Sequence, residues 1–159
     1  MNSDADASGI MAGKRGLVMG VANERSIAWG ISAAAAAQGA ELAFTYQGDA
    51  LKKRVEPLAA SVGSSLVMPC DVTDEASMDA VFDELKKTWG SIDFIVHAIA
   101  YSDKEELKGG YVDTTRDNFQ RTMDISVYSF TALARRAAEL MTDGGSMVTL
   151  TYYGCLLYT

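Results

Sequence analysis

Apolar residues in this chain follow two patterns: short continuous runs, and longer segments in which they recur every three or four positions. The short runs predict strands, and the run at 92–98 is apolar almost throughout, which is typical of a strand buried on both faces of a sheet. The predicted strands are residues 15–20, 41–46, 65–68, 92–98 and 147–150.

The longer segments predict helices between these strands. Residues 26–38 and 50–61 give the first two helices, and residues 115–141 give a long helix before the last strand. Between them, Thr73 predicts the N-cap of a helix that ends at Gly90. Apolar residues inside each segment recur at helical spacing, so each helix should bury one face.

Strands that alternate with helices in this order indicate βαβ units and a parallel sheet with helices on both faces. The predicted fold class is therefore α/β, a Rossmann-like doubly wound sheet. Such a sheet has about six strands, and the 159 residues supply only the five predicted here. The predicted sheet is incomplete, and its fifth strand should lie at an uncovered edge.

Composition and charge narrow the class of protein. Hydrophobic residues make up 48% and charged residues 22% of the chain, as in soluble globular domains. The formal net charge of -7 disfavours a nucleic acid partner. No apolar run approaches the roughly 20 residues of a membrane span. Cys70 and Cys155 belong to no metal-binding or disulfide pattern, so we expect no metal and a cytoplasmic location.

The turn after the first strand is the first candidate for chemistry. Residues 20–30 form a glycine-bounded turn that opens a helix, and the free amides at a helix start can hold a pyrophosphate. A plain tight turn with Ser26 as helix cap explains the same residues equally well. The usual G-x-G-x-x-G spacing is absent, so the turn alone decides nothing.

Two polar residues follow the next strands. Gln47 comes where dinucleotide folds contact the adenosine ribose, and its neutral side chain leaves the choice between NADH and NADPH open. Asp71 can accept a hydrogen bond from an adenine amino group, or it can serve as a helix cap before Thr73.

Taken together, these segments resemble the NADH-dependent enoyl-[acyl-carrier-protein] reductases of bacterial type II fatty acid synthesis, members of the short-chain dehydrogenase/reductase superfamily. The resemblance covers residues 14–154. Its blocks occur in order and at compatible spacing, which makes it more specific than any single turn. They are Gly20-Val21-Ala22-Asn23, Ser26-Ile27-Ala28-Trp29-Gly30, Phe44-Thr45-Tyr46-Gln47, Cys70-Asp71-Val72, Val96-His97-Ala98-Ile99-Ala100 and Leu150-Thr151-Tyr152-Tyr153-Gly154.

The resemblance implies NADH as cofactor and an enoyl thioester on acyl carrier protein as substrate, with a homotetramer as the usual family assembly. It also implies that Ser102 lies near the acyl chain and that Tyr152 is the first of two active-site tyrosines. Cofactor contacts are implied for Gly20, Ala22, Ser26, Ile27, Gln47, Asp71, Val72, Ala98 and Ile99. His97 is expected to be a core residue rather than a proton donor.

The resemblance breaks off after Gly154. The family continues to a second tyrosine and a lysine that together stabilise the developing oxyanion, whereas this chain has no lysine after Lys108. We therefore expect a C-terminally truncated reductase that folds poorly alone and lacks reductase activity. The alternatives are a non-catalytic dinucleotide-binding half-domain and a general short-chain dehydrogenase/reductase. The domains predicted are a flexible tail (1–13), the partial Rossmann domain (14–154) and a tail unlike the family (155–159).

Overall fold

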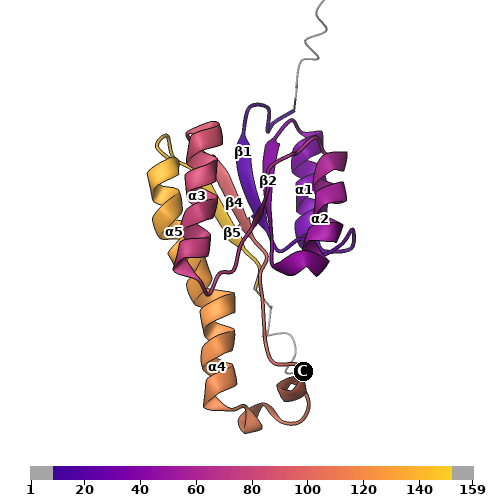
Figure 1. The fold of residues 1–159 in the computed structure, drawn as a ribbon, viewed down its shortest axis with the longest axis vertical. Helices are drawn as coiled ribbons and strands as arrows, with labels where there is room; N and C mark the ends of the chain where they lie inside the picture. The colour runs from indigo at the N-terminus through magenta and orange to yellow at the C-terminus, as the bar shows by residue number, and fades with distance from the viewer. Residues whose placement is uncertain (1–8, 152–159) are drawn as a thin grey trace, which may run out of the picture.

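A computed structural model describes residues 9–151 of the protein. Its centre is a five-stranded sheet in which all neighbouring strands are parallel, in the order β3-β2-β1-β4-β5 (Figure 1). The predicted fold class, a Rossmann-like α/β sheet with five strands, is confirmed. The strands are β1 (Arg15–Met19), β2 (Glu41–Tyr46), β3 (Val67–Pro69), β4 (Phe94–His97) and β5 (Ser146–Thr149).

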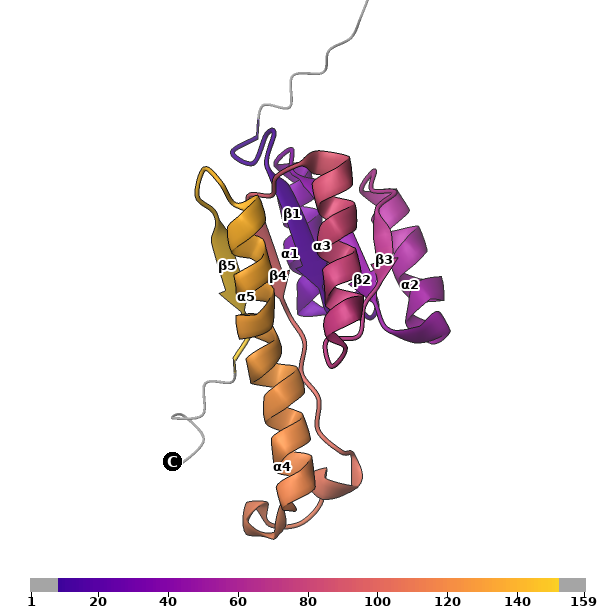
Figure 2. The same cartoon turned by 60° about the vertical axis from the view of Figure 1, so that its left-hand side comes forward.

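Helices cover both faces of the sheet. α1 and α2 pack on one face and α3 and α5 on the other, while α4 continues the line of α5 beyond the carboxyl ends of the strands (Figures 1 and 2). The helices are α1 (Ile27–Ala37), α2 (Gly48–Ser61), α3 (Glu75–Trp89), α4 (Arg116–Met123) and α5 (Ser129–Leu140). Shorter turns are η1 (Glu105–Leu107), η2 (Tyr111–Asp113) and the π-helical turn η3 (Asp124–Tyr128).

Successive strand residues face two different cores. Leu17 and Ile95 pack on the side of α3 and α5, whereas Val18 and Val96 pack on the side of α1 and α2. All four side chains are buried. A parallel sheet covered on both faces needs apolar residues at every strand position, which is why the strands appear in the sequence as continuous runs.

The long helix predicted over residues 115–141 is interrupted. Thr115 is its N-cap, and the hydroxyl oxygen accepts a hydrogen bond from the N–H of Asn118 at 3.2 Å. The π-helical turn η3 then separates α4 from α5. Ser129, directly after η3, donates its hydroxyl to the carbonyl of Ile125 at 2.7 Å. A π-turn changes the helical phase locally, and the spacing of apolar residues gave no sign of it.

The cap predicted for the third helix is wrong by one residue. Asp74, not Thr73, occupies the N-cap of α3, and its carboxylate accepts from the N–H of Ala76 at 3.0 Å. Thr73 instead donates its hydroxyl to Asp71. The predicted end of the helix at Gly90 agrees with the structure, where glycine adopts φ +77°.

The two ends of the described chain differ in their contacts. At the start, the N–H of Met11 donates to the carbonyl of Gln38 at 3.0 Å, and the Met11 side chain packs against the core beside α1. At the other end, β5 pairs only with β4 within the described residues, and Val148 is 45% exposed. The predicted division into domains stays a prediction.

Candidate functional site

A cavity of about 230 Å³ opens where the first four strands end. β1 lies between β2 and β4, so the chain order reverses beside it, and open α/β sheets bind ligands at such a reversal. The cavity brings together segments that are far apart in the sequence. Among its lining residues are seven that the resemblance assigns to the cofactor: Gly20, Ala22, Gln47, Asp71, Val72, Ala98 and Ile99.

Gly20 lies where the main chain after β1 comes very close to the main chain after β4. Its φ of +99° is disfavoured for residues with a side chain, and a Cβ built at this position would come within 2.0 Å of the carbonyl oxygen of Ala98. Only glycine fits here without displacing the backbone. The end of β1 therefore presents main chain and no side chain to the cavity at Gly20.

The turn between β1 and α1 is held by its own side chains. Asn23 accepts the N–H of Arg25 on its side-chain oxygen at 2.8 Å, and its carbonyl accepts the hydroxyl of Ser26 at 2.6 Å. Ser26 is the N-cap residue of α1, yet its side chain caps none of the helix amides. The first turn of α1 also holds no acidic residue. The positive end of this helix therefore has no internal anionic or side-chain partner.

A pair of polar side chains joins the ends of β2 and β3. Gln47 donates its amide to Asp71 at 2.8 Å, while the N–H and hydroxyl of Thr73 donate to the other carboxylate oxygen at 2.9 and 2.7 Å. The hydrogen bonds from Thr73, followed by that from Gln47, hold the pKa of Asp71 below its usual value. Asp71 thus orders the loop before α3 as an anion, and Asp74 fills the capping role.

The wall beneath this pair is apolar. Burial raises the pKa of the Cys70 thiol to about 11, and the neighbouring charge of Asp71 acts in the same direction. The thiol is therefore protonated near neutral pH and unreactive. It packs as a small apolar group in the core against α3.

Some residues implied by the resemblance do not line this cavity. Ile27 is 66% exposed at the start of α1, next to Ser26. Ser102 accepts a hydrogen bond from the Asn118 amide at 3.1 Å, at the start of α4. Tyr152 lies outside the described residues.

The sequence reasoning missed the wall contributed by the π-turn. Ile125 of η3 lines the cavity together with Tyr101, which follows β4. Ser126 binds the main chain of Tyr101 twice, accepting its N–H at 3.0 Å and donating to its carbonyl at 3.3 Å. Because the helical pattern predicted one uninterrupted helix, no feature of the sequence singled out this turn.

The same pattern of residues occurs in known proteins. A family described as Enoyl-(Acyl carrier protein) reductase matches residues 20–158. The chain belongs to this family. It is 68% identical to the enoyl-[acyl-carrier-protein] reductase [NADH] 1 of Rhizobium meliloti over 94% of the chain and 55% of that relative. It is 52% identical to the enoyl-[acyl-carrier-protein] reductase [NADH] FabI of Rickettsia felis, over 92% of this chain and 56% of that relative.

Solved structures of enoyl reductases have the same fold. FabI from Candidatus Liberibacter asiaticus superposes with a TM-score of 0.91 at 53% identity, covering 95% of this chain and 58% of that one. The reductase of Anaplasma phagocytophilum, solved with NAD, gives a TM-score of 0.89 at 56% identity, covering 92% and 56%. The chain thus spans a little over half the length of the relatives it matches.

Among residues 9–151, every helix falls short of the length or apolar character that a bilayer crossing requires. Within that same range, no group of three or more His, Cys, Asp or Glu side chains is placed to hold a metal ion.

Proposed function

We propose that this chain binds NADH in the cavity at the strand ends and supplies that site for reducing the trans-2 double bond of enoyl thioesters on acyl carrier protein. The main support is the contact at Gly20, where β1 and β4 approach so closely that a Cβ has no room. Gly20 therefore puts no side chain into the cavity, and the turn after it leads to the start of α1, where the Ser26 side chain makes no capping hydrogen bond. A diphosphate fits this combination of open space and free amides.

Different residues around the cavity would contact different parts of NADH. The first amides of α1 would bind the diphosphate, while Gln47 and Asp71 would orient the adenosine. Cys70 and Val72 supply apolar surface against the adenine ring. Bound NADH provides the hydride, and Ile99 would lie on the nicotinamide side. At each of these positions, the role we propose for the chain is to bind or orient NADH.

The proposal extends to partners and location. We expect acyl carrier protein to deliver the substrate in the cytoplasm, without nucleic acid or membrane. Self-association, as in the homotetramers implied by the resemblance, would suit the surface formed by α4 and η3, where Phe119, Met123 and Val127 are exposed. A sedimentation measurement on the purified chain tests this part.

The binding proposal is tested by two glycine variants. Gly20→Ala places a methyl group against the Ala98 carbonyl, so NADH affinity should fall at least about tenfold, or about 1.4 kcal/mol. Gly30→Ala is the matched control, because Gly30 lies inside α1 with open space around its Cβ position. Titration of NADH fluorescence on both variants and on the unaltered chain measures the difference.

Equal NADH affinity in Gly20→Ala and Gly30→Ala, or no binding by the unaltered chain, would contradict the proposal. A second candidate is dinucleotide binding without catalysis, because no lysine follows Tyr152 within the 159 residues. Oxidation of NADH in the presence of an enoyl thioester separates the two. Binding without oxidation supports the second candidate.

A further inference from the structure

The single histidine of the chain joins three elements that meet behind the cavity. His97 ends β4 and is fully buried. Its Nδ1 lies 2.8 Å from the hydroxyl of Thr149 on β5, and its Nε2 lies 2.8 Å from the hydroxyl of Ser129 at the start of α5. Ser129 in turn donates to the carbonyl of Ile125 in the π-turn η3.

These contacts indicate which ring nitrogen of His97 carries the hydrogen. A serine hydroxyl carries one hydrogen, and Ser129 uses it on the Ile125 carbonyl at 2.7 Å. The Ser129 oxygen can then only accept from His97, so Nε2 carries the hydrogen. Nδ1 is left as the acceptor for the Thr149 hydroxyl. The result is a directed series of hydrogen bonds from β5 through β4 to η3.

We propose that His97, as the neutral Nε2–H tautomer, is a positioning residue that holds the π-turn against the strand ends and thereby sets the Ile125 wall of the cavity. Ile125 lines the cavity, whereas His97 does not. The histidine thus acts through Ser129 rather than by touching a ligand. The part that concerns ligand affinity rests on the proposed function, while the part that concerns the turn does not.

The surroundings of His97 favour the neutral ring. Burial lowers the pKa of the imidazole below its usual value. The ring of Phe130 packs against it with centroids 5.6 Å apart. No charged side chain is among its hydrogen-bonding partners, which are the hydroxyl groups of Ser129 and Thr149.

The tautomer is tested directly by nitrogen-15 spectroscopy. The chain has one histidine, so a sample labelled at histidine and prepared without a histidine tag gives one pair of ring signals. We expect Nε2 to appear protonated and Nδ1 unprotonated at neutral pH. Protonation of Nδ1 instead, or exchange between both tautomers, would overturn the proposal.

The positioning role is tested with two variants that each keep half of the contacts. His97→Gln places an amide near the Nε2 position and can still donate to Ser129, whereas His97→Asn keeps a polar group only near Nδ1. Amide hydrogen exchange in residues 125–130 should become about tenfold faster in His97→Asn and stay near the original rate in His97→Gln. Ser129→Ala should behave like His97→Asn, and Thr149→Val should not.

NADH titration of the same variants adds a second readout. Affinity should fall about threefold to tenfold in His97→Asn and recover in His97→Gln. If both variants speed exchange equally, His97 is a packing residue only and the proposal fails. If the unaltered chain binds no NADH, the proposed function fails, while the exchange measurements still decide the role of His97.

Discussion

The body of the sheet and the projecting helix α4 are held in place by different forces. Phe44 of β2 is completely buried in the core between the sheet and α1 and α2, whereas Phe119 of α4 is 47% exposed. Around Phe119 the order comes from polar contacts. Glu106 accepts the N–H and hydroxyl of Thr115, and Asn118 accepts the N–H of Asp103.

The difference explains how the cavity is built. Its strand-end walls belong to the tightly packed body, while Ile125 and Tyr101 belong to the segment linked to α4. Hydrogen bonds with exposed partners are individually weak, and segments that rely on them open locally more often than a packed core does. We therefore expect the wall formed by Ile125 and Tyr101 to have lower local stability than the walls at the strand ends.

The largest expected effect comes from removing the same side chain in the two regions. Phe44→Ala leaves a cavity in the core and should lower the free energy of unfolding by about 3–5 kcal/mol. Phe119→Ala removes a half-exposed ring and should cost less than about 1 kcal/mol. Urea unfolding of both variants gives the comparison. Similar losses in the two variants would show that α4 is packed as tightly as the sheet.

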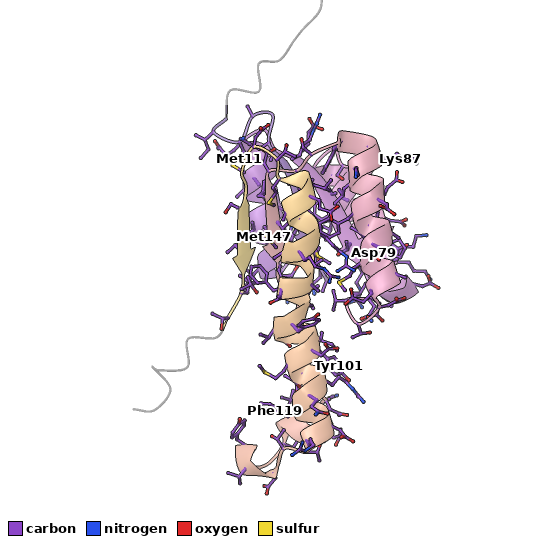
Figure 3. The ribbon with its side chains drawn as sticks, turned by 90° about the vertical axis from the view of Figure 1, so that its left-hand side faces the viewer. Met11, Asp79, Lys87, Tyr101, Phe119 and Met147 are labelled. Carbon is purple, nitrogen blue, oxygen red and sulfur yellow. The ribbon has the colours of Figure 1, made fainter. Side chains whose placement is uncertain are left out.

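A smaller effect is expected where charges join the helices of the body. Arg136 of α5 is only 8% exposed and binds Asp79 at 2.6 Å and Glu75 at 2.7 Å on α3. Asp79 faces the space between the two helices (Figure 3). Asp79→Asn should lower the free energy of unfolding by about 1.5 kcal/mol, because a largely buried cation loses one of its two anions.

The control for this pair lies on the same helix. Glu84 and Lys87 form an exposed pair at 3.1 Å, so Glu84→Gln should leave the free energy of unfolding nearly unchanged. Thermal unfolding of both variants at two salt concentrations measures the difference. A loss in Glu84→Gln that matches that of Asp79→Asn would remove the distinction between buried and exposed pairs.

The sequence predicts the strands of the sheet more completely than the polar contacts at their ends. Continuous apolar runs located all five strands, because both faces of a parallel sheet are buried. Asp71 emerged with two alternative roles. In the structure Asp74 is the cap, while Asp71 accepts hydrogen bonds from Thr73 and from Gln47, which lies 24 positions earlier. Contacts at that separation cannot be read from local spacing.

The π-turn escaped prediction for a similar reason. Residues 116–140 contain no proline or glycine that would announce a break. The turn is accompanied by contacts between Ser129, Ile125 and His97, and the histidine comes from a strand 32 positions away from the serine. Tertiary contacts of this kind have no local signal, so sequence periodicity gives one helix where the structure has three helical segments.

The N-caps of α3 and α4 allow the same comparison between the sheet and α4, with a smaller expected effect on stability. Asp74→Ala removes the cap of α3, which packs along the sheet, and should lower the free energy of global unfolding by about 1 kcal/mol. Thr115→Ala removes the cap of α4 and should lower it by only a few tenths of that value, because the first turn of α4 can fray alone. Amide exchange at residues 116–119 should nevertheless rise in Thr115→Ala. Equal losses in global stability would mean that α4 unfolds together with the body.

The smallest expected effect is the acid dependence of stability at the polar junction between the ends of β2 and β3, where Gln47 binds Asp71. Hydrogen bonds from Thr73, with a further one from Gln47, hold the pKa of Asp71 below its usual value. A carboxyl whose pKa is lower in the folded state stabilises the fold above its unfolded pKa of about 3.9, and this stabilisation disappears as the pH falls through the folded pKa. Thr73→Val removes the hydroxyl donor, whereas Thr73→Ser keeps it. Urea unfolding between pH 7 and pH 2.5 should therefore show a weaker acid dependence in Thr73→Val than in Thr73→Ser. Parallel pH profiles in the two variants would mean that the hydroxyl contributes nothing to the stability of the anion, and the junction between β2 and β3 would then depend on packing alone.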